Sequence, residues 1–483
     1  GVTGQMIAIL TEQNVQVSVN QLGPNDVLIS PELGDFSAVD FAGAVDIVPL
    51  GESAARKLEP ALAAFSMDAP QYAAWNAAKQ SRRPVAPTIE VIRIDTAELR
   101  HVNPDVAQAV FSTAFRSGTA DTALQRAIDA LYATDSFQQI SARTEIGADS
   151  LSTLVIEPRE KTWGPDFLRL GLTLDTDFEG NSGFTVLGDY RETWMNQRGL
   201  EWRTTGSLGD INSLRTELRQ PLDLALRWTV NAGVGWQQRI DETFADDTAV
   251  ARLRQNTLRG SLDVGRRFGT SGEWRFGIER ERFASRVVTG DRSVALPSQD
   301  ASLLFSRMTF DQLDSWDFPR SGYFLRADLN YAARDLGGDL DYRRLSVEWQ
   351  GAAGGPRHSL SLLVRHEDSL GSILPIQGAF SLGGFENMSG LSARQILANQ
   401  ISFARVVYSR QLGRSGALVR GVYVGGSLEA ASVRERLNSL DPTYEGLAGS
   451  LFMSLDTRLG PFYLAGGMAE SGEAAFYLFL GRP

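Results

Sequence analysis

Residues 167–175 read FLRLGLTLD, and this pattern decides the fold. Leucine stands at every second position from 168 to 174, with arginine, glycine and threonine between. Successive Cβ atoms of a β-strand point to opposite faces, so a period of two predicts a strand with one apolar face. The same alternation occurs in WTVNAGVGWQ (228–237) and in YFLRADLNYAAR (323–334).

Alternating segments of this kind fill the chain from residue 166 to its end. We predict about sixteen of them, each roughly ten residues long, which is the length that a tilted strand needs to cross a bilayer. Turn residues such as GGD (337–339) and GGP (354–356) separate many of them. The predicted strands are 166–175, 182–193, 200–209, 212–222, 227–239, 251–267, 272–284, 300–311, 321–334, 341–352, 357–367, 400–411, 417–431, 446–457, 461–469 and 474–482.

A closed antiparallel barrel is the architecture that these strands favour. In lipid no backbone N–H or C=O can stay unpaired, so a spanning sheet must have no free edge. The alternative is a large soluble β-sandwich or propeller. Tryptophans near the predicted strand ends argue against it, because they are typical of the interfacial girdles of membrane proteins. They are Trp163, Trp194, Trp202, Trp228, Trp236, Trp274, Trp316 and Trp349.

The composition excludes several classes of function. A formal net charge of −11 argues against a nucleic-acid partner, which needs a basic surface. The chain has no cysteine, so disulfides, thiolate metal sites and cysteine nucleophiles are excluded. Its three histidines, His101, His358 and His366, show no metal-ligand spacing, and we expect neither a metal nor a cofactor. The sequence contains no run of eighteen or more apolar residues, so it predicts no transmembrane helix.

Residues 1–65 predict the end of an α/β domain, with helical spacing at 5–13, a buried strand at 26–31 and helices at 39–48 and 53–65. Its most specific letters are QM (5–6), EQN (12–14), DVLI (26–29) followed by Pro31, Leu33 and Gly34, DF (40–41), and GE (51–52) followed by Ala54 and Ala55. In these letters the stretch resembles the C-terminal part of the bacterial patatin-like phospholipase domain.

The resemblance implies a chemistry whose residues this chain lacks. Patatin-like phospholipases use a Ser–Asp dyad, with the serine in Gly-x-Ser-x-Gly, the aspartate in Asp-Gly-Gly or Asp-Gly-Ala, and a Gly-rich oxyanion hole. The nearest string, GESAA (51–55), lacks the closing glycine and begins a helix, so we expect Ser53 to be structural. We predict no catalytic residue in this chain and a parent serine phospholipase whose dyad lies upstream of Gly1. The chain opens without a signal peptide, so we expect a fragment or a processed product.

Residues 66–87 predict a helix and a proline-containing linker, and residues 88–160 predict the order β-α-α-β-β. Asn103 and Pro104 are typical of a helix start, and ATDSF (133–137) precedes the second strand. This order ahead of a barrel resembles a single POTRA domain. Such domains bind partners by adding strands to an exposed sheet edge. A plain spacer is an equal alternative.

The barrel, residues 161–483, carries two further signals. Asp311, Asp314, Pro319 and Gly322 precede or open a predicted strand. FSLGG (380–384) and MSGL (388–391) lie in the longest predicted loop, 368–399. Both signals resemble motifs of the superfamily of outer-membrane assembly and two-partner-secretion barrels.

In that superfamily the loop after the eleventh strand folds into the lumen, and its tip usually carries an arginine before a glycine. Here Ser389 precedes Gly390, and Leu391 follows where an aromatic residue is usual. Gly383 and Gly384 supply flexibility to the same loop. The serine leaves a translocase-type contact and a simple plug of the lumen both open.

We therefore expect a mainly β chain: the truncated end of a patatin-like α/β domain, one POTRA domain and a 16-stranded transmembrane antiparallel β-barrel. The first hypothesis is the anchoring and surface-display part of a phospholipase, similar to the type V d autotransporters. The second is a protein translocase or insertase, and the third a solute pore. We expect the bacterial outer membrane as location, with the POTRA domain in the periplasm and the cell surface as one location for the patatin-like domain. Expected partners are outer-membrane lipid, the barrel assembly machinery and periplasmic chaperones during insertion, and phospholipid as the parent protein's substrate.

The purified 483-residue chain should not hydrolyse short-chain esters, because it carries neither the nucleophile nor the base of the dyad. A colorimetric ester assay checks this. Turnover that disappears in a His366→Ala variant would contradict the prediction, since it would place a hydrolytic site at His366, Glu367 and Asp368.

Overall fold

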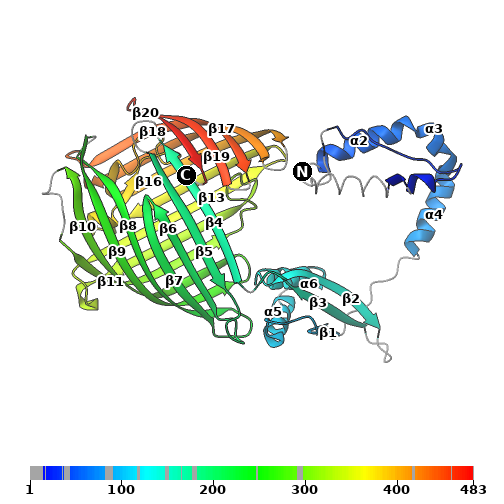
Figure 1. The fold of residues 1–483 in the computed structure, drawn as a ribbon, viewed down its shortest axis with the longest axis horizontal. Coiled ribbons are helices and arrows are strands. Elements are labelled where there is room, and N and C mark those ends of the chain that lie inside the picture. Colours follow the sequence, from blue (N-terminus) through cyan, green and yellow to red (C-terminus); the bar gives the residue numbers. More distant parts are fainter. Residues whose placement is uncertain are drawn as a thin grey trace. The chain divides into compact units, whose positions relative to one another are not determined.

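The computed structural model describes residues 15–16, 18–34, 36, 44–81, 91–116, 120–146, 152–164, 166–176, 182–245, 248–290, 297–415, 419–457 and 460–481. The chain divides into two compact units, Gly1–Thr88 and Ile89–Pro483 (Figure 1). None of the described helices is long and apolar enough to span a membrane.

The first unit is helical from Ala44 to Ser81, apart from short breaks, and residues 21–34 form turns and irregular chain. It contains α2 (Ala44–Lys57), α3 (Glu59–Leu62), a 3₁₀ turn η2 (Ala63–Phe65) and α4 (Ala69–Ser81), so a helix does precede the linker region. In the described part of the helices predicted at 39–48 and 53–65, the chain forms α2 followed by two shorter turns, and residues 39–43 lie outside the described residues. The helix predicted at 5–13 lies outside the described residues.

The strand predicted at 26–31 is wrong. This segment has no sheet partner among the described residues, and Leu28 and Ile29 are exposed. A lone strand cannot pair its own backbone groups, so an apolar run by itself does not make a buried strand.

The second unit begins with a small domain of the predicted β-α-α-β-β order, here called the βααββ domain. Its sheet has the order β1-β3-β2, with β1 parallel and β2 antiparallel to β3. Asn103 begins the first helix as expected, because its Oδ1 accepts a hydrogen bond from Asp105 N at 2.9 Å. Phe111, Leu131 and Ile156 are fully buried between helices and sheet. The elements are β1 (Val91–Ile94), α5 (Pro104–Arg116), α6 (Ala120–Tyr132), β2 (Phe137–Ile146) and β3 (Ser152–Glu160).

The rest of the unit is a closed antiparallel barrel of 16 strands, as predicted (Figure 1). Each predicted segment corresponds to one strand, and sequence neighbours pair around the wall. The short β15 (Phe380–Leu382) adds to β16 inside the longest loop. The wall consists of β4 (Asp166–Thr176), β5 (Ser182–Glu192), β6 (Glu201–Gly209), β7 (Ile211–Pro221), β8 (Trp228–Ala245), β9 (Thr248–Phe268), β10 (Gly272–Gly290), β11 (Gln299–Asp311), β12 (Ser321–Ala332), β13 (Tyr342–Gly354), β14 (His358–Asp368), β16 (Ile396–Ser415), β17 (Val419–Arg436), β18 (Thr443–Thr457), β19 (Gly460–Ala469) and β20 (Ala474–Leu480).

The outer face of the barrel is apolar. Leu170, Leu428 and Leu451 are among its most exposed side chains, while Ser427, Glu429 and Ser450, which alternate with Leu428 and Leu451, are polar and buried. This is the reverse of a soluble protein and fits a wall that faces lipid. Several strands are longer than predicted, and β9 has 21 residues, because hairpin pairing continues beyond the bilayer thickness.

The motif at Asp311, Asp314, Pro319 and Gly322 shapes the turn between β11 and β12. Asp314 Oδ1 accepts hydrogen bonds from Arg320 N at 2.8 Å and Ser321 N at 3.1 Å. Asp311 Oδ1 accepts one from Leu313 N at 3.2 Å, and the Pro319 carbonyl accepts one from the Ser359 hydroxyl. Gly322 has a φ of +94°, and a Cβ there would lie 1.9 Å from Gln312 O.

A Gly322→Ala variant should be less stable by at least about 1–3 kcal/mol, since the side chain meets both an unfavourable φ and a backbone oxygen. The temperature at which the detergent-solubilised barrel loses its compact migration on a gel measures this. Gly355→Ala is the matched control, because a Cβ at Gly355 meets no atom within 4 Å. Equal melting of the two variants would contradict the assignment of strain to Gly322.

Candidate functional site

The loop between β14 and β16 lies against the inner wall of the barrel. Phe380, Leu382, Met388 and Leu391 are buried, and Ser389 has no exposed surface. It contacts wall residues whose strand neighbours face outward, such as Glu429 beside the exposed Leu428. The resemblance and the length of the loop predict that it lies in the lumen, and hydrogen bonds, ion pairs and ring contacts hold it against the wall.

One carboxylate anchors the loop tip. Glu429, on β17 and 2% exposed, accepts hydrogen bonds from Met388 N at 2.7 Å and Ser389 N at 2.8 Å through Oε2. Its Oε1 accepts from the Ser389 hydroxyl at 2.7 Å and the Ser427 hydroxyl at 2.5 Å. A buried carboxylate costs free energy unless its oxygens accept hydrogen bonds, and here both do. The short serine side chain lets the loop backbone itself reach the carboxylate.

Gly390 makes this close approach possible. Its φ is +103°, and a Cβ would lie 2.5 Å from Ala469 N and from Glu473 O. Its own N–H donates to the Tyr477 hydroxyl at 2.9 Å. A residue other than glycine would therefore push the loop tip away from β19 and β20.

Gly383 and Gly384 form the backbone turn that leads into the loop tip. Gly383 N donates to Asn387 O at 2.8 Å, and Gly384 N donates to Leu391 O at 3.0 Å. Both have positive φ, and a Cβ at Gly383 would lie 2.1 Å from Ser392 O. Backbone hydrogen bonds within the loop therefore fold it independently of its contacts with the wall.

Two arginines of the wall hold the other side of the tip. Arg405 Nη1 donates to Glu386 O at 2.7 Å and lies 3.1 Å from its carboxylate. Arg365 Nη2 donates to Asn387 Oδ1 at 2.8 Å. Since Glu386 has a φ of +56°, the tip adopts a conformation that these contacts must stabilise.

Aromatic rings complete the contact between loop and wall. Phe385 lies 5.3 Å from the Tyr477 ring and 5.9 Å from the Tyr463 ring. Phe318, from the turn shaped by Asp314 and Gly322, stacks on Tyr423 at 3.9 Å in the same buried cluster. The loop tip and this turn therefore meet through one apolar layer, which the sequence motifs did not reveal.

The closing pair of the barrel is short. β20 pairs with β4 through Leu478, Phe479 and Leu480 only, opposite Thr176, Asp175 and Leu174. No described strand pairs with the segment 166–173 of β4 on that side, although Gly481, which follows β20, lies beside Leu172 and Thr173. By contrast β4 pairs with β5 along its whole length.

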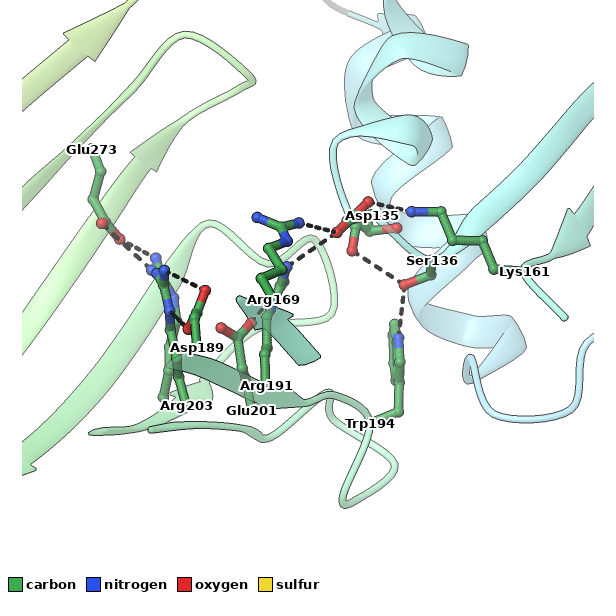
Figure 2. Close-up of polar contacts among 12 residues, drawn as sticks. Asp135, Ser136, Lys161, Arg169, Asp189, Arg191, Trp194, Glu201, Arg203 and Glu273 are labelled. Atoms are coloured by element: carbon green, nitrogen blue, oxygen red, sulfur yellow. Dashed lines mark hydrogen bonds and ion pairs between the residues drawn. The ribbon is translucent and has the colours of Figure 1, made fainter. Parts of the chain in front are cut away.

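The βααββ domain is held to one rim of the barrel (Figure 2). Asp135 pairs with Arg191 of β5 at 3.2 Å and with Lys161, and the Trp194 indole donates to the Ser136 hydroxyl at 2.9 Å. Leu226, from the β7–β8 turn, belongs to the core of the domain. Trp194 was predicted to belong to the lipid-interface girdle; it belongs instead to this joint, because a turn can direct its side chain away from lipid.

The described residues contain no group of three or more His, Cys, Asp or Glu side chains that could hold a metal. His366 Nδ1 contacts the Ser402 hydroxyl at 2.9 Å, and its Nε2 lies 3.8 Å from Asp368. His366 is half exposed while Glu367 is buried, as alternation in β14 dictates. These three residues therefore do not converge on one site.

Comparison with known proteins identifies the barrel. Residues 196–432 match the Omp85 superfamily domain. The matched residues, just under half of the chain, lie in the barrel, and a barrel of this kind indicates a protein of the bacterial outer membrane. No curated protein matches the chain.

Three solved structures have a similar fold. BamA from Haemophilus ducreyi lacking POTRA domains 1–3 has a TM-score of 0.58 and 10% identity, covering 82% of this chain and 84% of that chain. CdiB from Acinetobacter baumannii has a TM-score of 0.54 and 10% identity, with coverage of 81% and 74%. CdiB from Escherichia coli has a TM-score of 0.54 and 12% identity, with coverage of 99% and 97%.

These comparisons confirm the predicted barrel superfamily. They give no support to a patatin-like phospholipase parent or to an autotransporter, and those resemblances stay predictions. The name POTRA for the βααββ domain is likewise a prediction. Of the alternatives weighed from the sequence, the translocase fits the findings better than the phospholipase anchor.

Deleting residues 378–392 should raise single-channel conductance in planar bilayers severalfold, because a barrel of sixteen strands is wide enough to leave an aqueous lumen. Glu429→Gln should raise it as well, with frequent switching, because the amide replaces one acceptor oxygen by a donor that faces N–H and O–H groups. The control is Glu279→Gln, whose carboxylate pairs with Arg259 instead of the loop.

Unchanged conductance after the deletion would show that the loop does not restrict the lumen. If Glu279→Gln raised conductance as much as Glu429→Gln, a general loss of lumen charge would explain both effects.

Proposed function

We propose that this protein moves polypeptide chains into or across the bacterial outer membrane. The observation that carries the proposal is the short closing pair between β20 and β4. It leaves the segment 166–173 with one row of backbone N–H and C=O groups that no described strand pairs.

Such an edge is costly in a membrane. Each unsatisfied backbone group costs several kcal/mol in hydrocarbon, so the edge of β4 gains free energy from any strand that adds to it. An incoming polypeptide can supply that strand through main-chain hydrogen bonds without a specific sequence. A solute pore has no use for an open seam, because its wall is more stable when fully paired.

The exposed apolar side chains of the same segment agree with this role. Leu168 and Leu170 project from the outer face of β4 beside the unpaired edge. A strand that adds here would enter the lipid-facing wall with its apolar side chains outward. The loop anchored by Glu429 contacts strands from β14 to β20, and among the described residues its hydrogen bonds and ion pairs involve none of β4.

In this proposal, polypeptide chains reach the barrel from the side of the βααββ domain. We assign it as a POTRA domain in the periplasm, which delivers chains to the rim where Asp135 and Trp194 join it to the barrel. Its edge strand β2 has a free side in the sheet order β1-β3-β2 and can add an extended segment.

Locking the seam should stop transport. Leu174 and Leu480 are opposite each other in register, and the chain has no cysteine of its own. In the bacterium that makes the protein, oxidised Leu174→Cys/Leu480→Cys should lower the amounts of specific outer-membrane or secreted proteins severalfold, and reduction should restore them. Quantitative mass spectrometry of the two fractions measures this.

The matched control is Met468→Cys/Ala474→Cys, which joins β19 to β20 within the wall and changes none of the residues that pair with β4. Unchanged protein levels with the locked seam would refute the proposal. If the only protein to change location were the chain's own N-terminal unit, the phospholipase-display hypothesis would replace it.

A further inference from the structure

A pocket of about 270 Å³ lies in the lumen mouth beneath the βααββ domain, and arginines dominate its wall. Figure 2 shows Arg169 and Arg191 pointing toward Asp135 of the domain. Ala133 and Thr134 of the domain close the pocket on one side, and Asp189 and Glu201 are its acidic residues. Its arginines are Arg169, Arg191, Arg203, Arg219 and Arg267.

Most of these arginines already have an ion-pair partner. Arg203 binds Asp189 through two hydrogen bonds, of 2.8 and 3.0 Å. Arg191 bonds to Glu201 at 2.9 Å and to Asp135 at 3.2 Å. Each of these carboxylates is therefore engaged.

Arg267 differs from its neighbours. Its cross-strand neighbour is Glu273, but the Glu273 carboxylate pairs with Arg219 instead. Among the described residues, the Arg267 side chain makes no ion pair and no side-chain hydrogen bond. A partly buried cation without a partner is unfavourable, so an anion that reaches it gains a strong interaction. The excess of positive charge at this site is local, because the whole chain carries a net charge of −11.

A larger cleft of about 570 Å³ adjoins the pocket and shares Arg267 with it. Helices α5 and α6 line one side through Val110, Ala114 and Ala130, and the rim turns line the other through Leu226 and Phe268. The cleft thus offers apolar contacts directly beside an unpaired guanidinium.

We propose that this site binds an extended acidic polypeptide segment, with a carboxylate of the segment on Arg267 and a neighbouring apolar side chain in the adjoining cleft. A guanidinium matches a carboxylate with two parallel hydrogen bonds. Arg267 faces the lumen, since it alternates with Arg266 and Phe268 on the outer face, so the site opens to cargo and not to membrane lipid. The proposal rests on the proposed function and adds the chemistry by which the entry side recognises its cargo.

Direct binding tests the site without transport. The full chain in nanodiscs is titrated with a fluorescein-labelled peptide of alternating Leu and Glu, and fluorescence anisotropy gives Kd. Arg267→Gln should weaken binding about tenfold, because one charge-assisted contact is lost. Arg266→Gln is the matched control: its guanidinium stacks on Trp228 outside the lumen at 4.9 Å, and binding should not change.

Three outcomes would overturn the proposal. Equal affinity for a Leu–Gln peptide would show that no carboxylate is recognised. Equal weakening by Arg266→Gln and Arg267→Gln would show general charge attraction. Pyrophosphate and the unlabelled acidic peptide are each tested for displacement of the labelled peptide. If pyrophosphate displaces it at lower concentration, and only when Arg267 is present, the site binds phosphate. The peptide-binding assay does not depend on transport. If the peptide still binds through Arg267 but the locked seam changes no protein level, the proposed function is refuted and the binding site stands.

Discussion

Backbone groups cannot stay unpaired in hydrocarbon, and the rest of this structure depends on that constraint. It requires the wall from β4 to β20 to close, and closure requires each strand to keep its register with both neighbours. The wall obeys the rule through hairpin neighbours such as β4 and β5. The closing pair of β20 and β4 is the exception, because it joins only three residues of each strand. Among the described strands, the shortest pairing around the wall is therefore the one that joins distant parts of the sequence.

The two sides of the closed barrel's lumen are filled by different groups, a folded loop on one side and charged side chains on the other. A wide barrel encloses more space than its own side chains occupy, so a loop can enter and bury apolar groups there. The loop at Phe385 and Met388 uses the wall after β14, where Glu429, Arg405 and Tyr477 meet it. On the side of β5 to β10 the wall is lined with ion pairs, such as that of Arg275 with Asp263 at 2.6 Å. One half of the lumen thus contains a folded loop, and the other a charged surface.

Much of this could be predicted from the sequence, for a local reason. Strand period, turn residues and apolar alternation act over a few neighbouring residues, so FLRLGLTLD and its repeats predicted all the wall strands to within their ends. The same applies to the helix start at Asn103 and to the turn glycine Gly322, whose positive φ is a property of the local backbone. Local patterns failed at residues 26–31, where an apolar run found no partner strand.

The tertiary structure alone decided which distant residues meet. Nothing in the spacing of the sequence connects Ser389 with Glu429, Trp194 with Ser136, or Phe318 with Tyr423. Nor does it show that Glu273 pairs with Arg219, while no described side chain forms an ion pair with Arg267. These contacts depend on how far the strands shift against one another when the sheet closes, and on which side of the rim each turn falls. Period two assigns a side chain to a face; only the closed barrel assigns it a neighbour.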